Sequence, residues 1–349
     1  MREFNFYPGP SKVYPSISEV IYEAYMKGIM SINHRSEMFM DLMGKTKDEL
    51  RSKLNIPKGY EIVFLSSATE SWEVISQSLV KNKSQHFYNG AFGEKWFEYA
   101  SRITEAEAVS FDIQEQLPLV KLDPKSDVIC LTQNETSNAT QIDPAILKKL
   151  RKLTNAVIAL DVTSSLAGIH LDLSQGDVWY ASVQKCFGLP AGLGIMILSP
   201  RAQKRAEEIN DKKYYNSLLQ VLANSRKNQT HYTPNVLNIY LLYKTQKRVK
   251  PIALVGKKTQ KRADYYYDTF KDIPGFDYLI QNKKVRSSTV IAVTHQDPKL
   301  VIDKATEKRM TLGKGYGQWK DDTFRIANFP AIKTLEIQKL IAFFEKDFK

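Results

Sequence analysis

Between about residues 60 and 200, short apolar runs alternate with stretches of helical periodicity. Such alternation is typical of βα units that build a mostly parallel sheet flanked by helices. We expect seven strands there, at residues 61–65, 85–88, 106–110, 128–131, 156–160, 178–181 and 193–198. Helices are expected between them at residues 70–80, 93–102 and 144–153. Asp143 and Pro144 should begin the last helix as its cap and first residue.

The pattern changes after about residue 200. Long helical stretches are expected first, at residues 202–210, 235–248 and 252–272. A mixed tail follows, with strands at 287–294 and 323–327 and helices at 298–308 and 332–347. Pro234 and Pro251 interrupt the helical stretches. We therefore expect an α/β protein with a large domain at 12–250 and a smaller α+β domain at 251–349, which residues 1–11 rejoin.

Composition narrows the class of protein. The chain has 349 residues, of which 43% are hydrophobic, enough for two cores. No apolar run reaches the roughly 18–20 residues of a membrane span, and the first residues do not form a signal peptide. Cys130 and Cys186 both lie in apolar surroundings, so a disulfide framework is not expected. We expect a cytoplasmic protein without a membrane partner.

The net charge of +12 favours anionic partners. The lysines are scattered along the chain, however, and the basic–aromatic motifs of nucleic-acid-binding proteins are absent from the sequence. We therefore expect no nucleic-acid partner.

Two ionisable residues follow apolar strands in the region 156–198. Asp161 ends one strand, at the edge where parallel sheets bind ligands. Lys185 follows another, and burial there would lower the pKa of its amine and make it nucleophilic towards carbonyls. Pyridoxal phosphate needs such a lysine for its Schiff base and a carboxylate for its pyridine nitrogen. From spacing alone, Lys185 at a plain strand end and Asp161 as a helix cap remain equally open.

Several motifs carry a resemblance that spans residues 4–347. They are FYPGPSKVYP, INHRSEMF, QNETSNATQID, SVQKCFGLPAGLG, HYTPN and FRIANFPA. In order and spacing they resemble the class V aminotransferases of fold type I, most closely the branch that acts on phosphoserine. The resemblance implies a pyridoxal-phosphate-dependent aminotransferase with a seven-stranded sheet in its large domain, and it implies no metal.

The resemblance also implies roles at the cofactor. Lys185 would form the Schiff base and move the proton at the substrate α-carbon, while Asp161 would pair with the pyridine nitrogen. Phe92 falls where the family stacks an aromatic ring on the cofactor. Thr136 corresponds to a residue near the phenolic oxygen. Without the resemblance, Phe92 would be read as a core residue and Thr136 as part of a turn.

The cofactor phosphate would lie at the turn before the second expected helix, because a helix N-terminus presents free amides to an anion. The resemblance places Ala68, Thr69 and Gln184 there, and adds Thr233 from a partner subunit. The protein would then be a homodimer with composite active sites. Read alone, the turn would be an ordinary helix start with Thr69 as the cap.

Substrate recognition is expected to use arginines, which bind carboxylates and phosphates in a bidentate manner. By resemblance, Arg325 would bind the α-carboxylate of the amino acid, and His34 with Arg35 would bind its distal anion. The implied reaction joins phosphoserine and glutamate with 3-phosphohydroxypyruvate and 2-oxoglutarate, as in serine biosynthesis. The expected small-molecule partners are therefore an amino acid and a 2-oxo acid.

Two positions depart from the phosphoserine branch. Thr69 stands where an arginine is usual, and residues 314–317 read Lys-Gly-Tyr-Gly where Lys-Gly-His-Arg is usual. The loss of these cations weakens the case for a doubly charged substrate. A transaminase of alanine or serine with glyoxylate or pyruvate is the first alternative. A cysteine desulfurase or lyase, which needs an exposed reactive thiol, and a catalytically inactive relative are the others.

Overall fold

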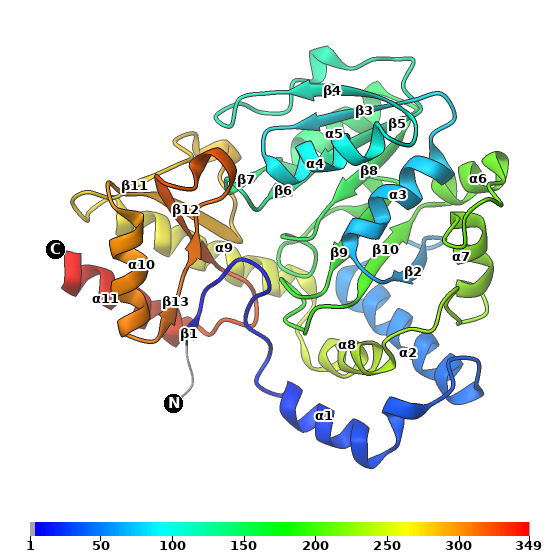
Figure 1. The fold of residues 1–349 in the computed structure, drawn as a ribbon, viewed down its shortest axis with the longest axis horizontal. Helices are drawn as coiled ribbons and strands as arrows, with labels where there is room; N and C mark the ends of the chain where they lie inside the picture. The colour runs from blue at the N-terminus through cyan, green and yellow to red at the C-terminus, as the bar shows by residue number, and fades with distance from the viewer. Residues whose placement is uncertain (1–3, 349) are drawn as a thin grey trace.

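A seven-stranded sheet forms the centre of the larger lobe of the molecule (Figure 1). The computed structural model describes residues 4–348. In spatial order the strands are β2 (Glu61–Leu65), β10 (Gly194–Leu198), β9 (Val178–Ser182), β8 (Val157–Asp161), β5 (Val128–Thr132), β3 (Lys83–Tyr88) and β4 (Glu105–Ser110). Only β10 runs antiparallel to its neighbours in this sheet. The predicted mostly parallel α/β architecture is therefore confirmed.

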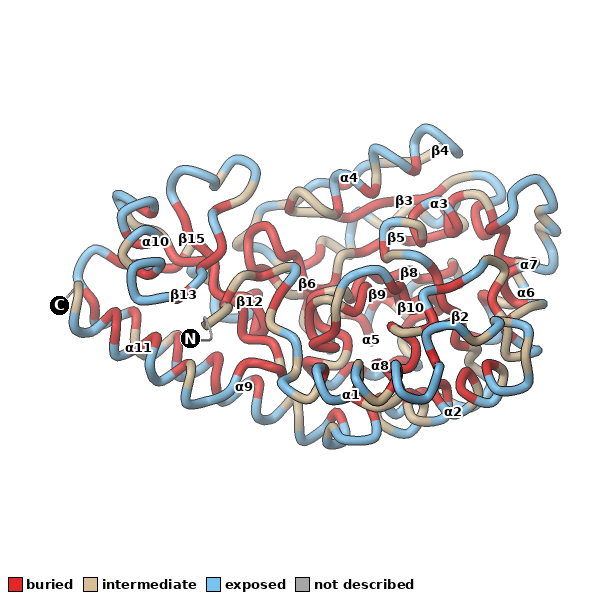
Figure 2. The backbone as a smooth tube through the Cα atoms, turned by 60° about the horizontal axis from the view of Figure 1, so that its bottom comes forward, coloured by how far each residue is buried: buried red, intermediate tan, exposed pale blue. Residues whose placement is uncertain are grey.

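Both faces of the sheet are buried at β2, β5, β8, β9 and β10, because alternate residues of these strands pack into different cores. In β2, Ile62 and Phe64 join one core, and Val63 and Leu65 join the other. The helices of the first core include α2 (Glu37–Leu54), α5 (Pro144–Leu153) and α8 (Val236–Arg248). The second is covered by α3 (Ala68–Leu79), α4 (Ala91–Ala100), α6 (Pro200–Ile209) and α7 (Leu218–Ser225). The central strands are accordingly buried along their length (Figure 2).

A second, four-stranded antiparallel sheet forms the smaller lobe. Its spatial order is β11 (Asp277–Tyr278), β12 (Val290–Thr294), β15 (Thr323–Ala327) and β14 (Gly313–Lys314). The helices α10 (Pro298–Glu307) and α11 (Thr334–Phe348) belong to this lobe (Figure 1). The first strand of the chain, β1 (Phe4–Asn5), pairs with β13 (Met310–Thr311) beside this sheet. The long helix α9 (Ile252–Phe270) contributes to both lobes, with Ile252 in the large core and Phe270 in the small one.

Most predicted elements agree with the structure to within a few residues. Helix α5 has the predicted bounds, and Asp143 accepts a hydrogen bond from the amide of Ala145 at its start. The prediction did not include α1 (Ile17–Met26), α2 or α7. Helix α3 begins at Ala68 with Ser67 as its cap, so the interpretation of Thr69 as the cap is wrong. Residues 1–3 and 349 of the predicted small domain lie outside the described residues. Among residues 4–348, no helix is both long and apolar enough to span a bilayer.

Candidate active site

A cleft of about 370 Å³ lies at the carboxyl ends of β5, β8 and β9. The last residue of each strand lines it: Thr132, Asp161 and Ser182. Lys185 lines it from the loop that follows β9. Parallel strands present their ligands at this edge, and the structure therefore brings the two key residues of the sequence prediction into one cleft.

The amine of Lys185 is buried and held by hydroxyl groups. Its Nζ donates to Thr136 Oγ1 at 2.6 Å and to Ser164 Oγ at 3.0 Å. Burial lowers the pKa of Lys185 to about 8, although Asp161 and Glu135 oppose this shift. About a tenth of the amine is therefore unprotonated at pH 7, far more than for an ordinary lysine, and the unprotonated form is the nucleophile towards a carbonyl. Gly9 packs on the side chain so closely that a Cβ there would stand 2.8 Å from Cε of Lys185.

Asp161 is a buried carboxylate without a cationic partner at ion-pair distance in residues 4–348. It accepts the amide of Thr163 at 2.9 Å. Burial raises its pKa, while the bonds from Thr163 and the charge of Lys185 act in the opposite direction. A buried carboxylate in this state favours a cationic partner inside the cleft. The protonated nitrogen of a pyridine ring has the required charge.

Other polar atoms of the cleft are also buried without a partner in the described part of the chain. They are Thr132 Oγ1 and Gln184 Oε1. Buried polar atoms in folded proteins are nearly always hydrogen-bonded. Their concentration around Lys185 and Asp161 fits a polar ligand with a ring, a charged nitrogen and an anionic group, such as pyridoxal phosphate.

The N-terminus of α3 forms one end of this cleft. The amide of Ala68 donates to Ser182 Oγ at 2.7 Å, and that of Glu70 donates to Ser67 Oγ at 3.1 Å. The amide of Thr69 has no acceptor within residues 4–348. A free amide at a helix N-terminus binds anions, so this turn suits the cofactor phosphate. Gly194 allows the turn to pack on β10, because a Cβ there would stand 2.6 Å from the backbone of Ser67.

Phe92 also lines this cleft, from the first turn of α4. Lys185 Nζ is 5.3 Å from its ring centroid. The backbone of this turn is held by Glu135, whose carboxylate accepts the amides of Phe92 and Gly93 at 3.2 and 3.1 Å. Glu135 is fully buried and also accepts two bonds from Ser137. The sequence analysis missed it, since the Asn-Glu-Thr triplet alone indicates only a turn.

Arg325 lies on β15 of the smaller lobe and is buried. Its Nε donates to the carbonyl of Lys314 and its Nη1 to the carbonyl of Thr136, both at 2.8 Å. Thr136 also holds Lys185, so the guanidinium is fixed next to the reactive amine. Burial lowers the pKa of Arg325 because the charge of the guanidinium is poorly solvated there. A bound anion such as a carboxylate would compensate this charge.

The structure does not bring His34, Arg35 or Thr233 into the cleft of their own chain. His34 and Arg35 lie in the turn before α2, and Thr233 is exposed in the segment before α8. Arg35 Nη1 donates to Asn224 Oδ1 at 3.0 Å and to Gln229 Oε1 at 2.5 Å. Its guanidinium is therefore held in place on the surface. Residues 4–348 contain no group of three or more acidic, histidine or cysteine side chains that could hold a metal ion.

Comparison with known proteins identifies a family that agrees with the fit of the cleft to pyridoxal phosphate. The family model for class V aminotransferases matches residues 3–306. A phosphoserine aminotransferase from Rhodococcus opacus is 28% identical over 349 residues, 95% of this chain and 91% of the relative.

Solved structures extend this likeness. The crystal structure of a phosphoserine aminotransferase from Cytophaga hutchinsonii superposes with a TM-score of 0.95, at 31% identity and 99% coverage of both chains. An alanine–glyoxylate aminotransferase from Nostoc sp. shares the fold with a TM-score of 0.85, at 20% identity, covering 99% of this chain and 95% of its own. This chain thus belongs to the class V aminotransferases, pyridoxal-phosphate-dependent enzymes that transfer an amino group between an amino acid and a 2-oxo acid.

Proposed function

We propose that the amino acids are phosphoserine and glutamate, and that the oxo acids are 3-phosphohydroxypyruvate and 2-oxoglutarate. The observation that carries this proposal is the full-length likeness to a phosphoserine aminotransferase, at 31% identity over 99% of both chains. The buried guanidinium of Arg325 beside Lys185 supports it, because both amino acids carry an α-carboxylate that must be held next to the reactive amine.

In this proposal pyridoxal phosphate supplies an electron sink that stabilises negative charge at the substrate α-carbon. Lys185 Nζ takes a proton from that carbon and passes it to the cofactor, and Thr136 and Ser164 orient the amine. Asp161 keeps a positive charge on the pyridine nitrogen. The amide of Thr69 and the side chain of Gln184 bind the phosphate, and Phe92 covers the ring. Arg325 orients the substrate through its α-carboxylate.

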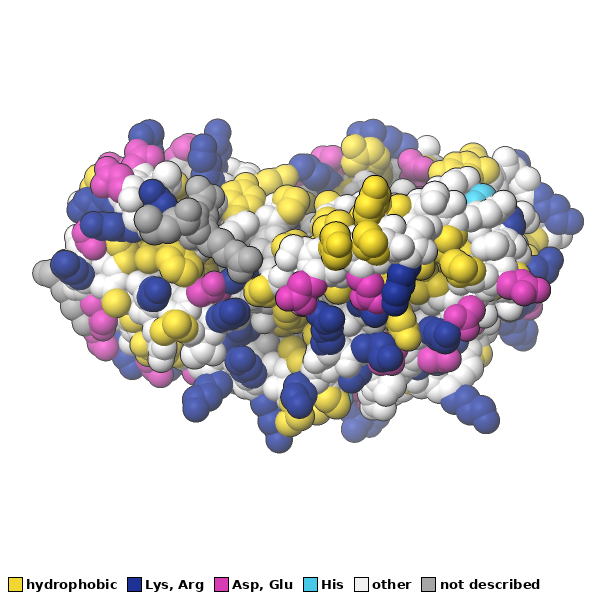
Figure 3. Space-filling view, turned by 90° about the horizontal axis from the view of Figure 1, so that it is seen from below, with side chains coloured by type: hydrophobic (Ala, Val, Ile, Leu, Met, Phe, Trp, Pro, Cys, Tyr) yellow, Lys and Arg dark blue, Asp and Glu magenta, His cyan; other side chains and the backbone are white. Residues whose placement is uncertain are grey.

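The second half of the site is proposed to come from a second copy of the chain. His34 and Arg35 lie close in sequence to exposed apolar side chains of α1, the short helix η1 (Ile29–Ser31) and α2. These are Tyr22, Tyr25, Met26, Met30 and Met38, with exposed fractions of 42–70%. Hydrophobic side chains gather near the middle of the face that carries α1 (Figure 3). A subunit interface on this face would bury them and would carry His34, Arg35 and Thr233 to the partner's cleft.

The alternative donor, alanine or serine, is favoured by one observation. Thr69, at the position of the usual arginine, lines the cleft with an uncharged side chain. The desulfurase alternative has less support, because Cys130 and Cys186 are both buried and burial raises the pKa of both thiols. Neither could act as an exposed thiolate.

Specificity constants for phosphoserine, glutamate, serine and alanine test the proposal. Wild type should favour phosphoserine and glutamate. Arg35→Ala should reduce these two by roughly 10-fold or more, the weight of one charge-assisted bond, and should affect alanine less because alanine has no distal charge. Arg325→Ala should reduce all four. A wild-type preference for alanine or serine, with no effect of Arg35→Ala, would show that the proposed substrates are wrong.

A further inference from the structure

Lys95 is a cation of the cleft that the sequence analysis did not consider. It lies on α4, one turn after Phe92, and it lines the same cleft as Lys185 and Asp161. Residues three apart on a helix share a face, so its ammonium lies on the side of α4 that carries Phe92. Its side chain is otherwise exposed to solvent.

A tyrosine of the smaller lobe holds this ammonium in place. Lys95 Nζ donates to Tyr316 Oη at 2.9 Å. The ring of Tyr316 stacks on that of Phe92, with centroids 5.3 Å apart and planes at 22°. Cζ of Arg325 lies 5.3 Å from the same ring centroid. Tyr316 therefore links the aromatic wall of the cleft to two cations, Lys95 and Arg325.

Lys95 has no carboxylate at ion-pair distance among the described residues. The bond with Tyr316 raises the pKa of Lys95, so the ammonium is charged at neutral pH. A charged group that lines a ligand cleft and lacks a protein counter-ion attracts an anion.

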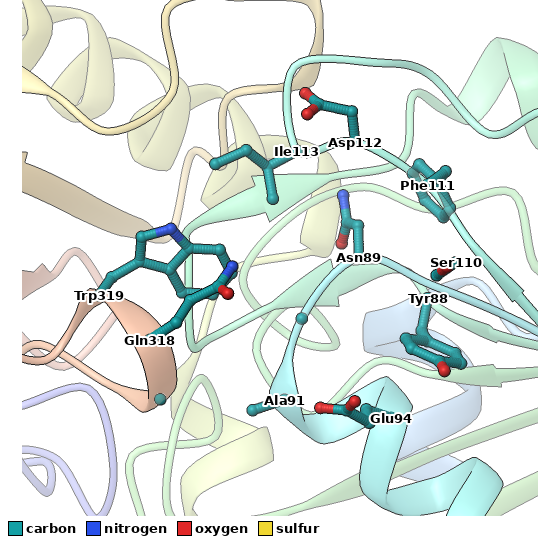
Figure 4. A pocket seen from close by; sticks show the side chains of 12 residues that line it. Tyr88, Asn89, Ala91, Glu94, Ser110, Phe111, Asp112, Ile113, Gln318 and Trp319 are labelled. Carbon is teal, nitrogen blue, oxygen red and sulfur yellow. The ribbon is translucent and has the colours of Figure 1, made fainter.

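A larger neighbouring cavity, of about 530 Å³, does not suit an anion. Gln318 and Trp319 of the short helix η5 (Gly317–Trp319) face Asn89 and Ile113 across it (Figure 4). Its lining includes the carboxylates of Glu94 and Asp112 and no lysine or arginine. The negative charge would repel a phosphate or a second carboxylate. The Lys95 side of Tyr316 is therefore the favoured place for a negatively charged group.

We propose that Lys95, positioned by Tyr316, binds the distal anion of the substrate whose α-carboxylate is bound by Arg325. It would replace the cations that the phosphoserine branch has at the positions of Thr69 and residues 316–317. The ligand is an amino acid with a phosphate or carboxylate on its side chain. This inference rests on the proposed function, because only such a substrate has a distal anion.

The test compares Lys95→Met, Lys95→Arg and, as a matched control, Lys148→Met on the exposed face of α5. The first readout is the ratio of the specificity constants for phosphoserine and alanine in the cofactor-loaded enzyme. The second is equilibrium binding of phosphoglycolate, which has a phosphate and a carboxylate but no amino group to transfer. Lys95→Met loses one charge-assisted bond, so the ratio of specificity constants and the affinity for phosphoglycolate should each fall by at least about tenfold. Lys95→Arg should retain most of the wild-type ratio and affinity, and Lys148→Met should match wild type in both readouts.

Tyr316→Phe adds a test of the positioning role, since it keeps the ring on Phe92 and removes the bond to Lys95. We expect a smaller fall of the same ratio than in Lys95→Met. If wild type prefers phosphoserine and Lys95→Met changes neither readout by more than about twofold, the role of Lys95 is refuted and the proposed function stands. If wild type prefers alanine and binds no phosphoglycolate, both are refuted together.

Discussion

The carboxylate of Glu135 accepts the backbone amide of Phe92 at 3.2 Å, across 43 residues of sequence. The same oxygen accepts the next amide, of Gly93, and the other oxygen accepts two bonds from Ser137. Glu135 therefore caps the N-terminus of α4, where a negative charge is favourable. Gly90 makes room for it, because a Cβ there would stand 2.4 Å from Cγ of Glu135. The orientation of the Phe92 ring over the cleft depends on this buried acid.

Glu135→Gln should destabilise the protein and loosen the ring of Phe92. An amide has one accepting oxygen, so its NH₂ group would face at least one pair of donors in a buried site. The expected loss is about 1–3 kcal/mol of unfolding free energy, with weaker cofactor binding. Denaturant unfolding and a cofactor titration measure the two effects. Glu94→Gln, on the exposed side of the same helix turn, is the control, and equal behaviour of the two variants would contradict the capping role.

The uptake of pyridoxal phosphate by the unloaded protein should depend on pH through Lys185. Only the unprotonated amine attacks a carbonyl, so the rate should rise with pH around a midpoint near 8. A midpoint near the ordinary lysine pKa of about 10.4 would refute the lowered value.

The same shift has a consequence for stability. Between pH 8 and the ordinary lysine pKa, the unfolded chain binds a proton at Lys185 that the folded chain does not. The contribution of Lys185 to stability therefore increases as pH rises through this window. Unfolding of the unloaded Lys185→Met variant across the same pH range should lack this contribution, and an identical pH dependence of the two proteins would contradict it.

Asp161→Asn should bind the cofactor but transaminate more slowly by about two orders of magnitude. The neutral amide cannot hold a positive charge on the pyridine nitrogen, so negative charge at the α-carbon is less stabilised. Stopped-flow measurement of α-proton removal reports this step directly. Asp143→Asn is the matched control, because asparagine caps a helix as well as aspartate does. An unchanged rate in Asp161→Asn would show that another carboxylate has this role.

Hybrid dimers test the composite site. Alone, Lys185→Ala should be inactive towards phosphoserine, and Arg35→Ala should keep about a tenth of the wild-type activity or less. In a hybrid of the two, one cleft has an intact Lys185 and receives an intact Arg35 from the partner. Random mixing should then restore about a quarter of the wild-type activity. A mixture no more active than its two parents would place Arg35 outside the partner's cleft.

Five strands of the large sheet, β2, β5, β8, β9 and β10, were predictable from the sequence because they are largely apolar runs, as is typical of strands buried on both faces. The antiparallel direction of β10 could not be predicted, because an apolar run looks the same for a parallel and an antiparallel strand. The missed helix α1 does carry a helical pattern, with Ile17, Val20 and Ala24 buried at spacings of three and four.

Some residues of the site could be predicted from the sequence, and others could not. Lys185 and Asp161 stand at strand ends, where sequence reasoning locates chemistry, and the structure brings them into one cleft. Glu135 and Lys95 could not be found this way. Their roles arise from contacts with Phe92 and with Tyr316, which are 43 and 221 residues away in the chain. Such contacts depend on the tertiary packing of segments far apart in the sequence, which local patterns do not specify.

Reduction of the cofactor-loaded protein with borohydride, followed by peptide mapping, tests the central claim most directly. Borohydride converts a Schiff base between pyridoxal phosphate and a lysine into a stable bond. We predict that the label is found on the peptide that contains Lys185, and that Lys185→Ala keeps the fold but takes up no label there. A label on another lysine of the wild-type protein, or none at all, would contradict the assignment of Lys185 as the residue that holds the cofactor.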